Sequence, residues 1–386
     1  MQDGVFTFRI RPEIIFGNGV SLRIGIEAKK RGGSNILLVV DPEIINAGLF
    51  DKVKSALTKE RLNVTVFDKV EPEPLLEIAD KCANIARDKG CNLVIGIGGG
   101  SAMDTAKAAS ILLTNNGLSR DYQGLDRINK PGVPKIMIPT TAGTGSEVTF
   151  TAVFTDNDLK AKTGINSEYL FADIALLDPE LTLSVPPEVT AYTGMDALTH
   201  AIEAYISVSS NTFSDLFALE AIRLISKSLK RAVQDGHDIE SRSNMLKGSL
   251  FGGIALANAG VGAAHALAYP LGGEYQVPHG IANGLLLPYV MEFNLDNNIE
   301  KFSLVTEVLG EKREGYTDIE FARESVSIVK RLIKDVKAPN KLRELNIPET
   351  AIEDLSSQAM KVTRPIENNP RKVTRKDVIE IYKKAY

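Results

Sequence analysis

Length, composition and charge already narrow the class of protein. The chain has 386 residues, 44% of them hydrophobic and 24% charged, which is typical of a globular protein with room for two domains. Its net charge of −4 and pI near 5.8 argue against a nucleic-acid partner or a polybasic membrane patch. No signal peptide or membrane span is evident, and the two cysteines, Cys82 and Cys91, are too few for a disulfide framework. We therefore expect a cytoplasmic protein with no membrane partner.

In chain order, the first 180 residues alternate short runs of branched aliphatic residues with amphipathic stretches. The aliphatic runs predict strands at Ile36–Val40, Val64–Phe67, Leu93–Ile97 and Lys135–Ile138. The amphipathic stretches predict helices at Ile44–Lys59, Leu75–Lys89 and Ala102–Leu113. This alternation predicts βαβ units, and hence an α/β domain built on a parallel sheet.

Asp41 ends the first predicted strand. An acidic residue in this position can accept hydrogen bonds from the hydroxyls of an adenosine ribose, and its charge would repel a 2′-phosphate. Alternatively, Asp41-Pro42 only opens a turn.

A glycine turn, Gly98-Gly99-Gly100-Ser101, follows the third predicted strand and opens the next helix. Backbone amides and the helix dipole at such a turn favour a phosphate, and glycine allows it to approach closely. Ser101 stands where the standard dinucleotide fingerprint has its third glycine, and the turn follows the third strand rather than the first. A plain tight turn therefore remains the alternative.

A second polar loop, TTAGTGSE at residues 140–147, follows the fourth predicted strand. Its hydroxyl groups suit a ribose, a phosphate or a carboxamide, because ligands of open α/β sheets bind at the carboxyl ends of the strands. The alternative is an ordinary polar loop.

From Pro186 onward, helical periodicity replaces the strand signals. Pro186-Pro187 followed by Glu188 predicts the start of a helix. Further helices are predicted at Glu220–Val233, Arg242–Ala259, Asp318–Val336 and Arg375–Tyr386. The sequence therefore predicts an α/β domain over residues 1–180 and an all-helical domain over residues 181–386.

Three of the four histidines lie in two short segments of the helical half. Asp196 and His200 are four residues apart, so they share one face of a helix. His265 and His279 lie in HALAYPLGGEYQVPHG. One carboxylate and three imidazoles are a credible ligand set for a divalent transition metal, the alternative being a surface Asp–His pair and two unrelated histidines. We assign no role to His237, which lies in a polar stretch of the sequence.

Together these segments resemble the iron-containing (group III) alcohol dehydrogenase family over essentially the whole chain. Six ordered motifs carry the resemblance: GGGSAMDTAK (98–107), TTAGTGSE (140–147), LLDPELTLSVPP (176–187), GMDALTHAIEAY (194–205), HALAYPLGGEYQVPHG (265–280) and NNPRKVTRKDVIEIYKKAY (368–386). The resemblance implies a dehydroquinate synthase-like fold. Residues 1–180 would form its dinucleotide-binding domain, and residues 181–386 its metal-binding, catalytic domain.

The resemblance also assigns roles to residues. Asp196, His200, His265 and His279 would bind a divalent metal, Fe²⁺ ahead of Zn²⁺ or another ion. The glycine turn would hold the pyrophosphate of NAD, and Asp41 would select NAD. The remaining residues of the cofactor site would be Gly98, Gly99, Gly100, Ser101, Asp104, Thr140, Thr141, Thr144, Ser146, Thr149 and Lys162. The substrate would face Thr151, Leu256 and Tyr269.

These roles predict a metal- and NAD-dependent alcohol dehydrogenase or aldehyde reductase for a small substrate, with hydride passing between the alcohol and the nicotinamide. Because four protein ligands fill a tetrahedron, the metal has to accept a fifth ligand, which favours iron. Two alternatives remain: a sugar-phosphate cyclase that uses NAD transiently on the same fold, and a catalytically silent binding protein. Relatives suggest a homo-oligomer, a dimer or larger.

Tyr269 departs from the family pattern. Many relatives have a proton-relaying histidine at this position, four residues after the first of the late metal ligands. A tyrosine, with an ordinary pKa of about 10, is a poorer relay at neutral pH than an imidazole. Tyr269 is therefore a candidate proton relay, with simple packing as the alternative.

Overall fold

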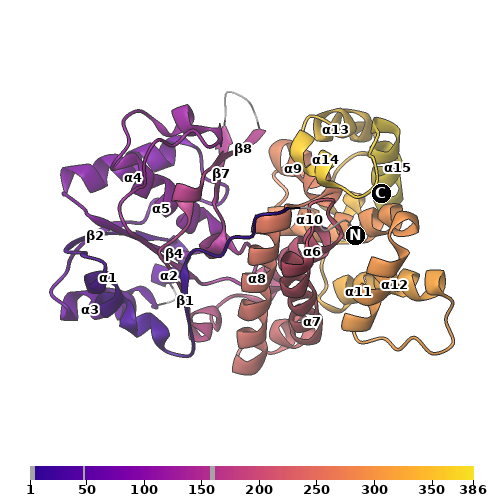
Figure 1. The fold of residues 1–386 in the computed structure, drawn as a ribbon, viewed down its shortest axis with the longest axis horizontal. Helices are drawn as coiled ribbons and strands as arrows, with labels where there is room; N and C mark the ends of the chain where they lie inside the picture. The colour runs from indigo at the N-terminus through magenta and orange to yellow at the C-terminus, as the bar shows by residue number, and fades with distance from the viewer. Residues whose placement is uncertain (1–4, 47, 157–160) are drawn as a thin grey trace. The chain divides into compact units, whose positions relative to one another are not determined.

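The computed structural model describes residues 5–46, 48–156 and 161–386. These residues form two compact units (Figure 1). The α/β unit is Ile10–Val185, and the helical unit is Pro186–Tyr386 together with residues 5–9. The dinucleotide-binding role of residues 1–180 and the metal-binding, catalytic role of residues 181–386 remain predictions.

A parallel sheet lies at the centre of the α/β unit. Among the described residues it has six strands in the order β1-β9-β6-β4-β2-β3. The strands are β1 (Glu13–Phe16), β2 (Asn35–Val40), β3 (Asn63–Phe67), β4 (Leu93–Gly98), β6 (Lys135–Pro139) and β9 (Ile174–Leu177). A smaller sheet has the order β5-β8-β7, and its strands are β5 (Gly124–Leu125), β7 (Thr151–Asp156) and β8 (Ala161–Asn166).

Helices cover both faces of the large sheet, as the alternation of side chains along β2 shows. Leu37 and Val39 enter one core with residues of the helices at 77–88 and 100–112, whereas Ile36 and Leu38 enter a second core with residues of the helices at 24–30 and 50–59. Burial on both faces explains why β2 and β4 read as continuous aliphatic runs. The helices are α1 (Ile24–Lys30), α2 (Pro42–Asn46), α3 (Phe50–Lys59), α4 (Glu77–Asp88) and α5 (Gly100–Leu112).

The four strands predicted from sequence are confirmed, each to within one residue at its ends. The single helix predicted at Ile44–Lys59 is wrong, because α2 ends at Asn46 and α3 begins at Phe50. Gly48 lies between them with a φ of +71°, a left-handed conformation that interrupts a helix. The strands β1, β5, β7, β8 and β9 were not predicted.

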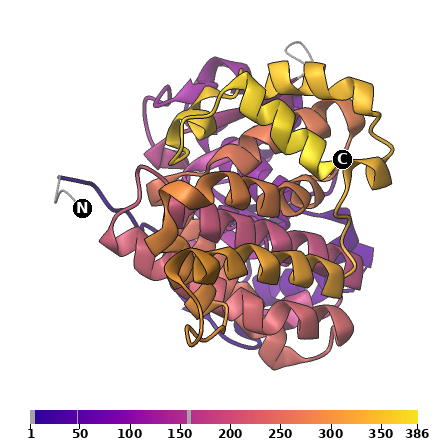
Figure 2. The ribbon, with the colours of Figure 1, turned by 90° about the vertical axis from the view of Figure 1, so that its right-hand side faces the viewer.

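The described elements of residues 186–386 are all helical. Helix α6 begins at Pro187, as predicted, and is buried along most of its length. Helix α7 begins eight residues before the predicted Glu220, because Asn211 caps it by accepting from the amides of Phe213 and Ser214. The helices are α6 (Pro187–Ile206), α7 (Thr212–Gln234), α8 (Ile239–Ala259), α9 (Ala263–Tyr275), α10 (His279–Asn294), α11 (Ile299–Val308), α12 (Asp318–Asp335), α13 (Ile352–Ala359), α14 (Thr363–Asn368) and α15 (Arg375–Ala385). The C-terminal α15 packs against α10 and α13 (Figure 2).

In the described part of the chain, no single helix has the length and apolar character needed to cross a membrane. Helices α8 and α9 meet the criterion of length and composition only as a pair, and they are bent by 104° at the break between them.

Candidate functional site

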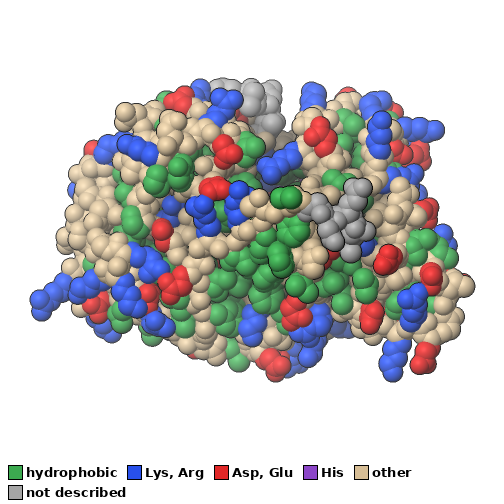
Figure 3. Space-filling view, in the orientation of Figure 1, with side chains coloured by type: hydrophobic (Ala, Val, Ile, Leu, Met, Phe, Trp, Pro, Cys, Tyr) green, Lys and Arg blue, Asp and Glu red, His purple; other side chains and the backbone are tan. Residues whose placement is uncertain are grey.

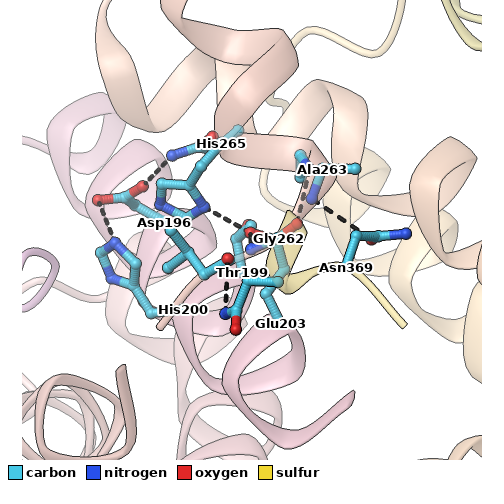
Figure 4. A network of polar contacts seen from close by, with 12 residues as sticks. Asp196, Thr199, His200, Glu203, Gly262, Ala263, His265 and Asn369 are labelled. Atoms are coloured by element: carbon cyan, nitrogen blue, oxygen red, sulfur yellow. Dashed lines mark hydrogen bonds and ion pairs between the residues drawn. The ribbon is translucent and has the colours of Figure 1, made fainter. Parts of the chain in front are cut away.

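The four predicted metal ligands lie together in the helical unit. Asp196 and His200 come from α6, His265 from α9, and His279 is the first residue of α10. One potential ligand atom from each lies within 4.8 Å of the others, and only His279 is more than slightly exposed. In Figure 4, Asp196, His200 and His265 point toward one another. The fold thus joins residues that are up to 83 positions apart in sequence (279 minus 196).

His265 presents one ring nitrogen to this cluster. Its Nδ1 lies 2.6 Å from Oε2 of Glu203, whereas its Nε2 is buried and has no hydrogen-bond partner among the described residues. A proton on Nδ1 would be donated to the carboxylate, which leaves the lone pair of Nε2 directed at the cluster. A buried polar atom without a partner needs an explanation, and a metal ion fits this donor set.

Glu203 holds the orientation of His265. Its carboxylate also accepts hydrogen bonds from the backbone amides of Gly262 (2.9 Å) and Ala264 (2.6 Å), at the beginning of α9 (Figure 4). The negative charge lies at the positive end of that helix. Sequence reasoning missed Glu203, although it follows His200 by three residues and so lies on the same face of α6.

Asn283 is a second residue that sequence reasoning missed. It lies one turn after His279 on α10, and its Nδ2 is 2.8 Å from Oδ1 of Asp196 and 3.1 Å from Nε2 of His279. Burial alone would raise the pKa of Asp196, but the three histidines and the Asn283 amide lower it to about 2. Asp196 is therefore a carboxylate at neutral pH, as a metal ligand must be.

Tyr269 lies beside this cluster. Its ring stacks on that of His279, with the centroids 5.7 Å apart, and its hydroxyl has no hydrogen bond among the described residues. Burial, with a smaller contribution from the carboxylates of Asp196 and Glu203, raises the pKa of Tyr269 to about 12. The phenol therefore keeps its proton at neutral pH.

Leu256, the other predicted substrate residue of this unit, is half-buried on α8.

Three of the predicted cofactor segments meet at the carboxyl edge of the large sheet. Strands β2, β4 and β6 are neighbours, so Asp41, Gly98 and Thr140, at the ends of these strands, lie close together. The backbone amide of Thr140 donates to the carbonyl oxygen of Gly98 (3.0 Å). Gly98 has a φ of +147°, and a Cβ atom there would lie 2.7 Å from Cβ of Asp41. Only glycine allows the two loops to approach this closely.

The glycine turn continues into α5. A Cβ atom on Gly100 would lie 2.9 Å from Cγ2 of Thr144, and one on Gly99 would lie 3.7 Å from Oγ1 of Thr141. The turn therefore faces the threonine loop, and Ser101 lies in the first turn of α5. Amides at the start of a helix have no partner within the helix, so this end can receive an anion.

Asp104, Ser146 and Thr149 are brought together too, but they are buried and bonded within the protein. The Ser146 hydroxyl donates to Asp104 (2.6 Å). The fully buried Lys107 lies 3.1 Å from the same carboxylate, and it donates to the Ser146 carbonyl (3.0 Å) and to the Thr149 hydroxyl (3.3 Å). These contacts brace the threonine loop against α5. Lys107 was not among the predicted residues, although it lies one turn after Asp104.

Lys162 and Thr151 belong to the small sheet. Nζ of Lys162 lies 3.0 Å from Oε1 of Glu73, a residue that was not predicted. The Thr151 hydroxyl donates to Oδ1 of Asn166 (2.8 Å).

Comparison with known proteins agrees with this arrangement. Residues 12–179 match the family profile described as "Iron-containing alcohol dehydrogenase", and residues 190–386 match "Fe-containing alcohol dehydrogenase family, C-terminal". Long-chain-alcohol dehydrogenase 1 of Geobacillus thermodenitrificans is 43% identical over 363 residues, which cover 93% of this chain and 91% of that protein.

Solved structures give the same result. A crystal structure of 1,3-propanediol oxidoreductase superposes with a TM-score of 0.97 at 36% identity, covering 99% of this chain and 100% of that one. Sulfoacetaldehyde reductase from Bifidobacterium kashiwanohense, in complex with NAD⁺, superposes with a TM-score of 0.89 at 31% identity, covering 99% of each chain. The chain therefore belongs to the iron-containing alcohol dehydrogenase family, as an alcohol dehydrogenase that depends on NAD and a divalent metal.

Proposed function

We propose that Asp196, His200, His265 and His279 hold the divalent metal, with iron as the first candidate and zinc or another divalent ion as the alternative. The observation that carries this proposal is the convergence of four potential ligand atoms, one from each residue, together with the buried, unpartnered Nε2 of His265. When bound, the metal supplies Lewis-acid chemistry to the oxygen of the substrate. Glu203 and Asn283 then act as positioning residues, because each bonds to a ligand through a buried contact.

For the cofactor, we propose that residues 1–180 are the dinucleotide-binding domain and residues 181–386 the metal-binding, catalytic domain. The glycine turn would hold the pyrophosphate at the N-terminus of α5, and Asp41 would bind the adenosine ribose. The close approach of Gly98 to Asp41 and of Gly100 to Thr144 supports this placement. The same site would include Gly99, Ser101, Asp104, Thr140, Thr141, Ser146, Thr149 and Lys162. Of these, the buried Asp104, Ser146 and Thr149 would shape the site rather than bind directly.

The substrate is proposed to be a small alcohol or aldehyde that faces Thr151, Leu256 and Tyr269. These side chains are uncharged, which suits a neutral substrate. The test is a panel of short alcohols, diols and aldehydes with NAD(H), on protein reconstituted with iron and handled without oxygen. Net formation of NADH from an alcohol is expected. Turnover of a sugar phosphate without NADH accumulation would instead favour the cyclase alternative.

Replacing Tyr269 by phenylalanine should lower kcat/KM by about 3- to 10-fold, the value of one hydrogen bond to the substrate. Because burial raises the pKa of Tyr269 to about 12, the phenol stays protonated and does not titrate between pH 6 and 9. The shape of the pH–rate profile over that range should therefore be the same in Tyr269→Phe. Steady-state kinetics at several pH values checks both points. A profile that changes shape would restore the proton relay predicted from sequence, and an unchanged rate would leave Tyr269 only a packing role.

A cytoplasmic location and a homo-oligomer, a dimer or larger, complete the proposal. Both cysteines are free and buried, which suits a reducing compartment.

Hydrophobic side chains gather over α7 and α8 (Figure 3), and Phe6, Phe213 and Leu216 are exposed by 47%, 50% and 63%. Exposed apolar groups of this size favour an interface between copies of the chain. Sedimentation velocity measures the oligomeric state.

A further inference from the structure

Lys162, a proposed cofactor residue, is held by an acidic partner. Its Nζ lies 3.0 Å from Oε1 of Glu73, and the two side chains are only 11% and 32% exposed. Lys162 stands opposite Thr155 in the pairing of β8 with β7. On that face of the small sheet, β7 carries the partly exposed Thr151, Val153 and Thr155, and the residues between them are buried on the other face. The ion pair is thus at one end of the face of β7 that also carries the proposed substrate residue Thr151.

The backbone around Glu73 is fastened to the same strand. The Thr155 hydroxyl donates to the Glu73 carbonyl (3.1 Å), the Thr155 amide donates to the Pro74 carbonyl (2.8 Å), and the Leu76 amide donates to the Thr155 carbonyl (3.1 Å). Glu73 itself has a φ of +52°. A side chain other than glycine, asparagine or aspartate is uncommon in this left-handed region, and strain of this kind persists where the surroundings fix it. Glu73 is therefore placed beside Lys162 by fixed backbone contacts and not by a mobile loop.

We propose that Glu73 is a positioning residue of the cofactor site, which holds the ammonium of Lys162 and offsets its positive charge. This inference rests on the proposed role of Lys162 in cofactor binding. An unpaired lysine would attract the negatively charged phosphates of NAD(H) at full strength. A lysine already paired with a carboxylate presents a nearly neutral group, and the carboxylate itself repels the phosphates. Glu73 thereby lowers the affinity of the site for the dinucleotide, which favours release of the product cofactor.

Glu73→Gln tests the proposal, because glutamine keeps the length of the side chain and an oxygen that can accept from Lys162, but removes the charge. The dissociation constant of NADH, measured by fluorescence titration of the protein, should fall by about 2- to 5-fold, the upper range of a partly exposed ion pair. Binding should also become more sensitive to salt, since Lys162 then acts as a free charge. Structural damage would act in the opposite direction and weaken binding.

Three further variants separate the explanations. Glu73→Gly should also tighten NADH binding, and glycine accepts the positive φ without strain. Glu71→Gln removes an exposed carboxylate two residues away and should leave binding unchanged. In a Lys162→Met background, Glu73→Gln should tighten binding much less, because no ammonium is left to be released toward the phosphates.

Unchanged or weaker binding in both Glu73 variants would overturn the inference, as would equal tightening in Glu71→Gln or in the Lys162→Met background. The proposed cofactor site fails in a different way. If Lys162→Met alone left NADH affinity unchanged, Lys162 would lie outside that site, and the inference would fall with it.

Discussion

Replacing His279 by alanine is expected to abolish alcohol oxidation, with a loss on the order of a thousand-fold or more. The physical reason is that a Lewis acid contributes several kcal/mol to the reaction, and each 1.36 kcal/mol is a factor of ten. Metal content, measured by elemental analysis after reconstitution with iron, should fall with the activity. Binding of NADH should persist, because the proposed cofactor residues all belong to the α/β unit.

His237 provides the matched control for this experiment. It is exposed, it lies outside the cluster, and His237→Ala should keep full activity and metal content. Glu203→Gln should give an intermediate result, with metal affinity lower by about 10- to 100-fold, because only the orientation of His265 is disturbed. A metal-free His279→Ala protein with full activity would contradict the metal proposal. Loss of NADH binding in the same variant would contradict the assignment of the cofactor to the other unit.

The sequence predicted the large sheet best where burial is most complete. Strands such as β2 and β4 are covered on both faces, so their sequences are continuous aliphatic runs that no surface element would carry. The small sheet was not predicted because β7 alternates partly exposed residues, two of them threonines, with buried residues, and β8 contains Gly164, so neither strand has such a run. The break before Phe50 was not predicted either. The apolar pattern of residues 44–59 continues across Gly48, whereas the left-handed backbone at Gly48 interrupts the helix.

Some residues of the candidate site could be predicted from the sequence and others could not, for a similar reason. Spacing and resemblance named the four residues that now lie within reach of one ion, because aspartate and histidine are scarce and recognisable ligands. Glu203 and Asn283 carry no such signal, since their importance comes from contacts with α9 and α6 that exist only in the fold. Conversely, Asp104 and Ser146 were predicted as cofactor residues, yet their polar atoms bond to each other and to Lys107. These internal contacts become visible only in the folded structure, and the cofactor roles of Asp104 and Ser146 stay predictions.

The native protein is expected to prefer NAD over NADP by about 100-fold or more in kcat/KM, because each 1.4 kcal/mol is a factor of ten. Asp41 is at the end of β2, against Gly98 of the proposed pyrophosphate turn. Its Oδ1 accepts the backbone amide of Glu43 (3.1 Å), whereas its Oδ2 has no hydrogen bond among the described residues. That second oxygen is available to a ribose hydroxyl. A 2′-phosphate in the same place would meet the carboxylate at close range, at a cost on the order of a few kcal/mol for an effective dielectric near 20.

The hydrogen bond from the backbone amide of Glu43 to Asp41 determines which Asp41 variant best tests the preference for NAD. Asp41→Asn keeps an oxygen for that amide and for the turn into α2, but removes the charge, so it should raise kcat/KM for NADP by at least about tenfold with a smaller loss for NAD. Asp41→Gly should relax the preference further, but it also removes the turn contact, so thermal unfolding must be measured alongside the kinetics. Glu43→Gln, an exposed carboxylate two residues away, should leave the preference intact and so separates a local contact from a general change in charge. Equal use of both cofactors by the unmodified protein would reduce Asp41 to a turn residue, the alternative that Asp41-Pro42 left open in the sequence.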